Sequence, residues 1–98
     1  MPLDNEIEKL KIVLNSRNGG KTTCKILEQL FDGPKNANNM ARILHIDYKT
    51  VIYHLNIIKG YDYVNLMKLN GITYYTVSDK LKNNKEEYYK ILKKQKIE

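Results

Sequence analysis

Side chains with the chemistry for catalysis or metal binding are few in this chain and lie far apart. Its 98 residues include 1 cysteine and 2 histidines, namely Cys24, His45 and His54. A closed zinc or arsenic site needs three or four such ligands, so we expect no metal site and no cofactor. Nothing near Cys24 in the sequence would activate its thiol, so we interpret it as a structural or surface residue.

A segment at 19–22, Gly-Gly-Lys-Thr, resembles the end of a phosphate-binding loop. The first glycine of that motif is missing, because Val13-Leu14-Asn15 stand where it should be, and no strand precedes the segment. There is also no Ser-His-Asp arrangement with supporting context. We therefore expect that the protein is not an enzyme.

The segment 48–59 carries a different chemistry, that of surface recognition. Val51, Leu55 and Ile58 recur at i, i+4 and i+7, which predicts one buried face of a helix. The outward face would then combine small polar, aromatic and basic side chains: Tyr48, Lys49, Thr50, Tyr53 and Asn56. Such a face suits a helix that enters the major groove of DNA, although helices of this kind also occur in cores that bind nothing.

A second short helix and a tight turn are expected to position that segment. Asn36 is a suitable cap for a helix over 37–44, and His45-Ile46-Asp47 would form the turn. Asp47 would cap the helix over 48–59, with Gly60 as its C′ residue. Ile46 and Val51 have the spacing of a hydrophobic staple, which would fix the angle between the two helices.

Helices are also expected before this unit. The first spans 4–15, with Asp4 as its cap and an apolar stripe of Leu3, Ile7, Leu10 and Leu14. The paired glycines and polar residues of 16–20 predict a break. The next helix spans 23–32, capped by Thr22 or Thr23 and ended by Gly33-Pro34.

A β-hairpin is expected after the two-helix unit. Two runs rich in β-formers, 61–69 and 72–77, flank Asn70-Gly71, which favours a type I′ turn. The register would pair Leu69 with Ile72 and Val64 with Val77. One face, which should cover the helices, would carry Val64, Leu66, Tyr75 and Val77.

The opposite face of the hairpin is too apolar for a face that meets only water. It would carry Asn65, Met67, Leu69, Ile72, Tyr74 and Thr76. Its expected cover is the C-terminal helix, the N-terminal helix or a second subunit. That C-terminal helix is expected over 78–98, capped by Ser78, with an interruption at Asn83-Asn84.

The charge and composition narrow the class of protein. The net charge of +6 favours polyanionic partners, nucleic acid before membrane surfaces. The surplus is concentrated in 21–60, with six basic and three acidic residues, and in 79–98, with seven and four. The length fits a single domain, and no apolar run is long enough to cross a membrane. The single cysteine and the absence of a secretory signal favour the cytoplasm.

In this order of elements, residues 21–78 resemble an ArsR-like winged helix-turn-helix of the archaeal and bacterial transcription-regulator type. The fold class is then mainly α with a small β-hairpin (α+β), extended by N- and C-terminal helices. The resemblance is carried by these segments: Lys25–Leu30, Gly33-Pro34, Met40-Ala41, Asp47–Val51, His54-Leu55 and Tyr75–Ser78. Metal-sensing members carry paired cysteines on the helix before the turn, and this chain lacks them at 37–43.

The resemblance implies a DNA-binding transcription regulator. Its recognition helix would be 48–59, its wing 67–74 and its active form a homodimer. We expect one domain over 1–98 with a core at 21–78, and dimerisation through terminal helices at 4–15 and 79–96. Two copies would place their recognition helices on the order of 34 Å apart on double-stranded DNA.

From this we assign roles in DNA binding. Base-edge contacts are expected from Lys49, Thr50, Tyr53 and Asn56. Contacts to phosphates or the minor groove are expected from Arg42, Tyr48, Lys59, Lys68 and Thr73. Two alternatives stay open: a winged helix that binds other proteins, and a nonspecific DNA binder that uses the lysine-rich tail at 85–98.

Overall fold

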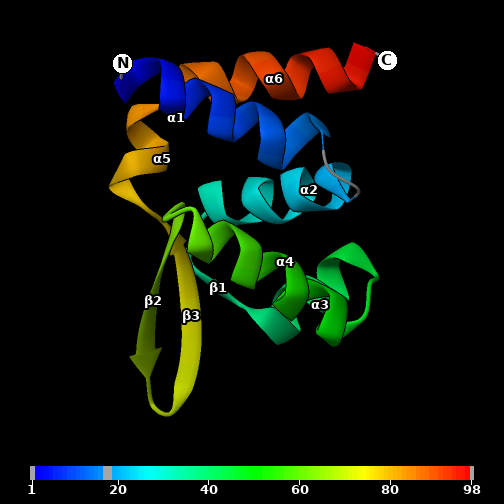
Figure 1. The fold of residues 1–98 in the computed structure, drawn as a ribbon. Helices are drawn as coiled ribbons and strands as arrows, with labels where there is room; N and C mark the ends of the chain where they lie inside the picture. Colours follow the sequence, from blue (N-terminus) through cyan, green and yellow to red (C-terminus); the bar gives the residue numbers. More distant parts are fainter. Residues whose placement is uncertain (1, 17–18, 98) are drawn as a thin grey trace.

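The computed structural model describes residues 2–16 and 19–97 (Figure 1). The elements follow the chain in this order: α1 (Pro2–Lys11), a π-helical turn η1 (Ile12–Ser16), α2 (Gly20–Phe31), β1 (Lys35–Asn36), α3 (Ala37–Leu44), α4 (Tyr48–Gly60), β2 (Val64–Leu69), β3 (Ile72–Val77), α5 (Asp79–Asn83) and α6 (Lys85–Ile97). This is an α+β winged helix with terminal helices, as the sequence predicts.

The terminal helices and the hairpin occupy opposite ends of the molecule. Helices α1 and α6 pack together at one end, α2 lies beneath them, and the β2–β3 hairpin projects from the other end beside α4 (Figure 1). Helix α2 packs on η1, α3, α4 and β3 and so forms the centre of the fold. The core draws side chains from nearly every element, including fully buried Leu10, Leu27, Leu55, Tyr63 and Tyr88.

The two-helix unit agrees closely with its prediction. The Asn39 N–H donates to Asn36 Oδ1 at 2.8 Å, which makes Asn36 the cap of α3. His45 ends α3 in the left-handed conformation, at φ 57°. Asp47 occupies the N-cap position of α4, but its side chain makes no capping hydrogen bond, so that part of the prediction is wrong.

Helix α4 ends one residue later than predicted, and its C′ residue is Asp62 rather than Gly60. Gly60 lies inside the helix, and Asp62 takes the left-handed conformation at φ 68°. The Asp62 N–H donates to the Lys59 carbonyl and the Tyr63 N–H to the Ile58 carbonyl, both at 2.9 Å, which is a Schellman motif. The Ser78 hydroxyl donates to the Asp62 carbonyl at 2.7 Å and ties this motif to the end of β3.

The hairpin has the predicted register. Leu69 pairs with Ile72 and Val64 with Val77, and Asn70 and Gly71 both have positive φ, at 52° and 79°. The sequence did not predict β1, which adds to β3 and makes a three-stranded antiparallel sheet in the order β1-β3-β2. One face of the hairpin was expected to cover the helices. Val64 and Val77, which pair at the end of the hairpin away from its turn, are buried, whereas Leu66 on the same face is exposed, so only that end of the face is buried.

The N-terminal helices differ from their predictions at the boundaries. Helix α1 begins at Pro2, so Asp4 is not its cap, and the helix continues through the π turn to Ser16. The π turn changes the helical spacing locally, so that two consecutive residues, Val13 and Leu14, are both buried in the core with Leu10. The side chain of Leu3 and the whole of residues 17–18 lie outside the described part of the chain.

Helix α2 begins at Gly20, not at 23, after Gly19 in the left-handed conformation at φ 84°. Thr22 and Thr23 are therefore inside the helix and neither is its cap. At the C-terminus, Ser78 caps α5 as predicted, because the Leu81 N–H donates to Ser78 Oγ at 3.2 Å. The helix is interrupted at Asn84, and α6 follows.

Candidate nucleic-acid interface

Helix α4 presents a row of polar side chains to solvent along one side. Val51, Leu55 and Ile58 are fully buried on the opposite side. Tyr48 is 50% exposed and Tyr53 is 59% exposed. Lys49 and Asn56 are exposed as well, and Thr50 is half-buried. The predicted division of this helix into two faces is therefore confirmed, and its outward face is available to a partner.

The buried side of α4 is held by a polar contact. His54 is buried, and its Nδ1 lies 3.1 Å from Thr23 Oγ1 of α2, within hydrogen-bond distance. Gly19 approaches the same ring so closely that a Cβ there would lie 2.7 Å from His54 Cε1. His54 is therefore a structural residue of the core.

The wing carries little charge. Lys68 pairs with Thr73 across the hairpin; Lys68 is exposed and Thr73 is half-buried. Lys68 is the only charged residue between 64 and 77. The wing can therefore supply one cationic contact and otherwise offers hydrogen bonds and apolar surface.

A groove joins the wing to the starts of α3 and α4. Its volume is about 390 Å³, and its lining is neutral: Asn36, Ala37, Asn38, Tyr48, Ile52, Gly71, Ile72, Thr73 and Tyr75. Two predicted contact residues, Tyr48 and Thr73, therefore meet at one site. Burial, with a smaller contribution from Tyr48, raises the pKa of Tyr75 above its ordinary value, so this hydroxyl stays protonated and able to donate.

Two residues of this groove, Asn38 and Tyr75, were not predicted as contact residues from the sequence. Tyr75 faces it because β1 pairs with β3, with Lys35 opposite Tyr75 and Asn36 opposite Tyr74. A two-residue strand leaves no pattern that could have revealed this pairing. The one available sequence signal was that Tyr75 and Val77, two residues apart in β3, lie on the same face of the strand.

The other predicted contact residues lie outside the groove. Arg42 is exposed in the last turn of α3, and Lys59 is exposed in the last turn of α4. Lys59 is roughly 16 Å along the helix from Tyr48, at 1.5 Å per residue. These two cations therefore extend the candidate interface beyond the groove.

Apolar side chains are exposed on both faces of the wing, with Leu66 on one face and Met67, Leu69 and Ile72 on the other. Leu66 is 43%, Met67 47%, Leu69 59% and Ile72 45% exposed. The N- and C-terminal helices were two of the expected covers, but α1 and α6 lie at the opposite end of the molecule (Figure 1). The third expected cover, a second subunit, stays a prediction.

Within 2–16 and 19–97, no group of three or more His, Cys, Asp or Glu side chains is placed to hold a metal ion. In that part of the chain, no helix has the length and apolar character needed to cross a membrane.

The fold and this surface define a winged helix-turn-helix protein. Residues 20–65 match the family described as "Bacterial regulatory protein, arsR family", so this segment is an ArsR-like helix-turn-helix. Among solved structures, HlyU from Vibrio cholerae N16961 is similar, with a TM-score of 0.62 and 15% sequence identity over 99% of this chain and 97% of that one. At this identity the likeness establishes the fold. No curated protein sequence matches the chain. The family match supports a DNA-binding transcription regulator.

Proposed function

We propose that this protein is a dimeric, sequence-specific DNA-binding regulator of transcription. The observation that carries the proposal is the exposed polar row on α4, fixed from behind by a buried core and flanked by a projecting wing. A helix presented in this way can enter a major groove, which is wide enough to admit it. The net charge of +6 gives the attraction to phosphates that such a contact needs.

Each predicted contact residue has a role in this proposal. Lys49, Thr50, Tyr53 and Asn56 read base edges from the outward face of α4. Arg42, Tyr48, Lys59, Lys68 and Thr73 contact phosphates or the minor groove. Asn38 and Tyr75 join this second set, because they line the groove with Tyr48 and Thr73. Neutral hydroxyl and amide groups of this kind are common donors to phosphate oxygens.

The terminal helices are the proposed dimerisation elements of a single domain, with the core at 21–78 between them. They lie at the end of the molecule opposite the wing, which leaves α4 free for DNA (Figure 1). Ile12 is 45% exposed beside α1, which suits a contact with a second copy. Ile12→Glu should therefore halve the mass of the species in solution without unfolding the chain.

Lys49→Ala tests the reading of bases. If Lys49 contacts a base, its removal should weaken specific binding by roughly 1–3 kcal/mol and leave nonspecific binding nearly unchanged. Lys82→Ala, which removes an equal charge from an exposed position on α5, is the matched control. Equal affinity of both variants and the parent for every duplex would remove Lys49 from the interface.

A second candidate function is supported by the exposed apolar side chains of the wing. A winged helix that binds another protein would use Leu66, Met67, Leu69 and Ile72, and would have little preference among DNA sequences. Leu69→Ser would then abolish binding to that protein, whereas a DNA reader should keep its preferred sequence in the same variant.

A further inference from the structure

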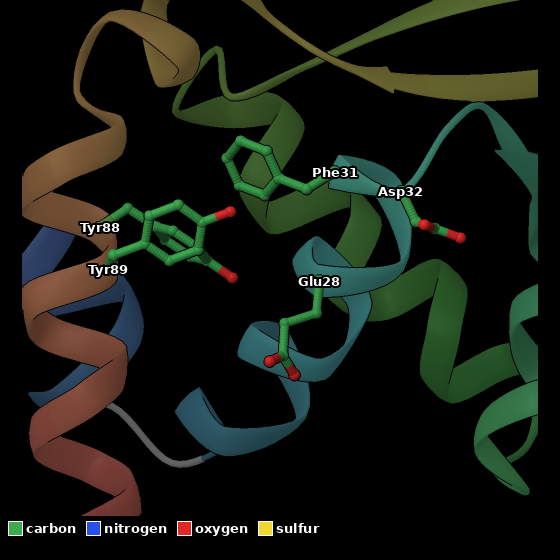
Figure 2. Close-up of a pocket in the computed structure, with 5 residues that line it drawn as sticks. All are labelled: Glu28, Phe31, Asp32, Tyr88 and Tyr89. Atoms are coloured by element: carbon green, nitrogen blue, oxygen red, sulfur yellow. The ribbon is translucent and has the colours of Figure 1, made fainter.

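A pocket separate from the proposed DNA interface lies between α2 and α6 (Figure 2). Its volume is about 290 Å³. Helix α2 contributes Glu28, Phe31 and Asp32, and α6 contributes Tyr88 and Tyr89. The size is close to the lower end of the range for small-molecule sites, so a small ligand would fit.

Three aromatic rings line the pocket, Phe31 from α2 and Tyr88 and Tyr89 from α6. The centroid of Phe31 lies 4.9 Å from that of Tyr88 and 5.9 Å from that of Tyr89, with interplanar angles of 36° and 35°. At these separations the rings contact one another, so a ligand would lie against their outward faces rather than between them. Tyr88 is fully buried and its hydroxyl lies 3.5 Å from the Cys24 carbonyl, whereas Tyr89 is 44% exposed and forms the outer wall.

Two carboxylates give this pocket a negative character in a basic protein. Glu28 and Asp32 are one helical turn apart on α2, and both line the pocket. Figure 2 shows Glu28 on the side of α2 nearer the two tyrosines, whereas the Asp32 carboxylate points away from them. Burial is the main cause that raises the pKa of Tyr88, with smaller contributions from Cys24 and then Glu28. Asp32 also lies 3.6 Å from Lys35, and most of it is exposed.

The rings already attract a cation of this chain. Lys85 Nζ lies 5.9 Å from the Phe31 centroid and 5.7 Å from the Tyr89 centroid. Both distances are within the range of a cation–π interaction. Lys85 is at the start of α6, with an exposed side chain that can move into solvent.

From these contacts we propose that the pocket binds a small organic cation, of the quaternary or alkylated ammonium class, which replaces the Lys85 ammonium over the rings. Aromatic faces and nearby carboxylates recognise such ions, because a weakly hydrated cation loses little on leaving water. A hydrated metal ion would need more oxygen ligands than two carboxylates supply.

This site has a direct structural link to the recognition helix. Helix α2 forms one wall of the pocket and packs on α4, while α6 forms the other wall and packs on α1 and η1. A bound cation that separates α2 from α6 would therefore change how α4 sits relative to the terminal helices. This regulatory consequence rests on the proposed function, whereas binding of the cation does not.

Choline is a suitable probe, with 3,3-dimethylbutan-1-ol as a neutral control in which carbon replaces nitrogen. Titration of the full chain without DNA, followed by NMR of the tyrosine rings, should show choline binding at least tenfold tighter than the alcohol. Tyr89→Leu should weaken choline binding about tenfold, as expected for loss of one cation–π partner. Lys85→Ala should tighten it severalfold.

Tyr53→Leu, at an exposed tyrosine on α4, is the matched control and should leave the choline affinity unchanged. Equal binding of choline and the alcohol would overturn the proposal. The proposal would also be overturned if Lys85→Ala did not bind choline, or if the Tyr53 and Tyr89 variants lost choline affinity equally. Because no DNA is present, failure here is distinct from failure of the DNA-binding proposal, which would show as a flat sequence preference.

Discussion

His54 Nδ1 of α4 and Thr23 Oγ1 of α2 lie 3.1 Å apart in the buried centre of the molecule. These residues are 31 positions apart in the sequence, and their contact joins the proposed recognition helix to the central helix of the fold. A directional polar contact fixes the rotation of α4 about its own axis more tightly than apolar packing alone. The exposed row on α4 is therefore held at a defined angle to the wing.

Thr23→Val should destabilise the protein, because it keeps the shape of the side chain and removes the hydroxyl beside His54. Loss of a partner for a buried polar group costs about 1–3 kcal/mol. Urea unfolding measures this change, with Thr73→Val on the half-buried wing as the control. If both variants unfold at the same urea concentration as the parent, the contact does not stabilise the fold.

Two glycine substitutions should have opposite effects on the free energy of unfolding. Gly19→Ala combines a φ of 84° with a Cβ only 2.7 Å from His54 Cε1, so it should cost about 2–4 kcal/mol. Gly60 lies in α4 with open space around it, so Gly60→Ala should stabilise by about 0.5–1 kcal/mol. Thermal unfolding of the two variants compares them directly, and a stabilised Gly19→Ala would refute the close approach.

Two buried tyrosines should respond differently to loss of the hydroxyl. The described residues offer no hydrogen-bond partner to the fully buried hydroxyl of Tyr63, so Tyr63→Phe should raise stability by roughly 1 kcal/mol. The Tyr88 hydroxyl lies 3.5 Å from the Cys24 carbonyl, so Tyr88→Phe should lower it by about 0.5–1 kcal/mol. Chemical denaturation distinguishes the two, and a change of the same sign in both would contradict this difference.

Stability should fall in alkaline solution because of these tyrosines. Burial raises the pKa of Tyr63 and of Tyr88 above the ordinary value of 10.0. Above about pH 10, the unfolded chain loses these protons while the folded chain keeps them. The contribution of these tyrosines to the free energy of unfolding is therefore fully present below about pH 10. The free energy of unfolding then decreases as pH rises, by up to about 1.4 kcal/mol per pH unit for each tyrosine.

The double variant Tyr63→Phe/Tyr88→Phe tests this pH dependence. Its urea midpoint between pH 9 and pH 11 should fall less steeply than that of the parent. An equally steep fall in the double variant would assign the alkaline sensitivity to other groups.

Local chemistry made much of the fold predictable from the sequence. Asn70-Gly71 specifies a turn with two positive φ angles, which fixes the hairpin register. Asn36 and the spacing of Val51, Leu55 and Ile58 define the two-helix unit and the buried face of α4. Each of these features depends on residues within a few positions of one another.

The features that the sequence did not reveal depend on distant contacts. The strand at Lys35–Asn36 exists only through its pairing with Tyr74 and Tyr75. The C′ position of α4 is at Asp62 instead of the predicted Gly60, and the Ser78 hydroxyl donates to the Asp62 carbonyl there. Thr23 has the character of a cap, yet its hydroxyl meets His54.

The candidate sites show the same division between local and distant information. The exposed row on α4 follows from helical spacing. The groove residues Asn38 and Tyr75, and the pocket between Phe31 and Tyr89, need the assembled fold.

Selection of bound sequences from a random duplex pool, at near-physiological salt and with the mass of the protein in solution recorded, tests the central claim most directly. A dimeric regulator should enrich a palindrome with half-sites on the order of 34 Å apart, bound by a species of twice the 11.5 kDa chain mass. A flat sequence profile with steep salt dependence, or a monomer bound to an asymmetric site, would contradict the claim.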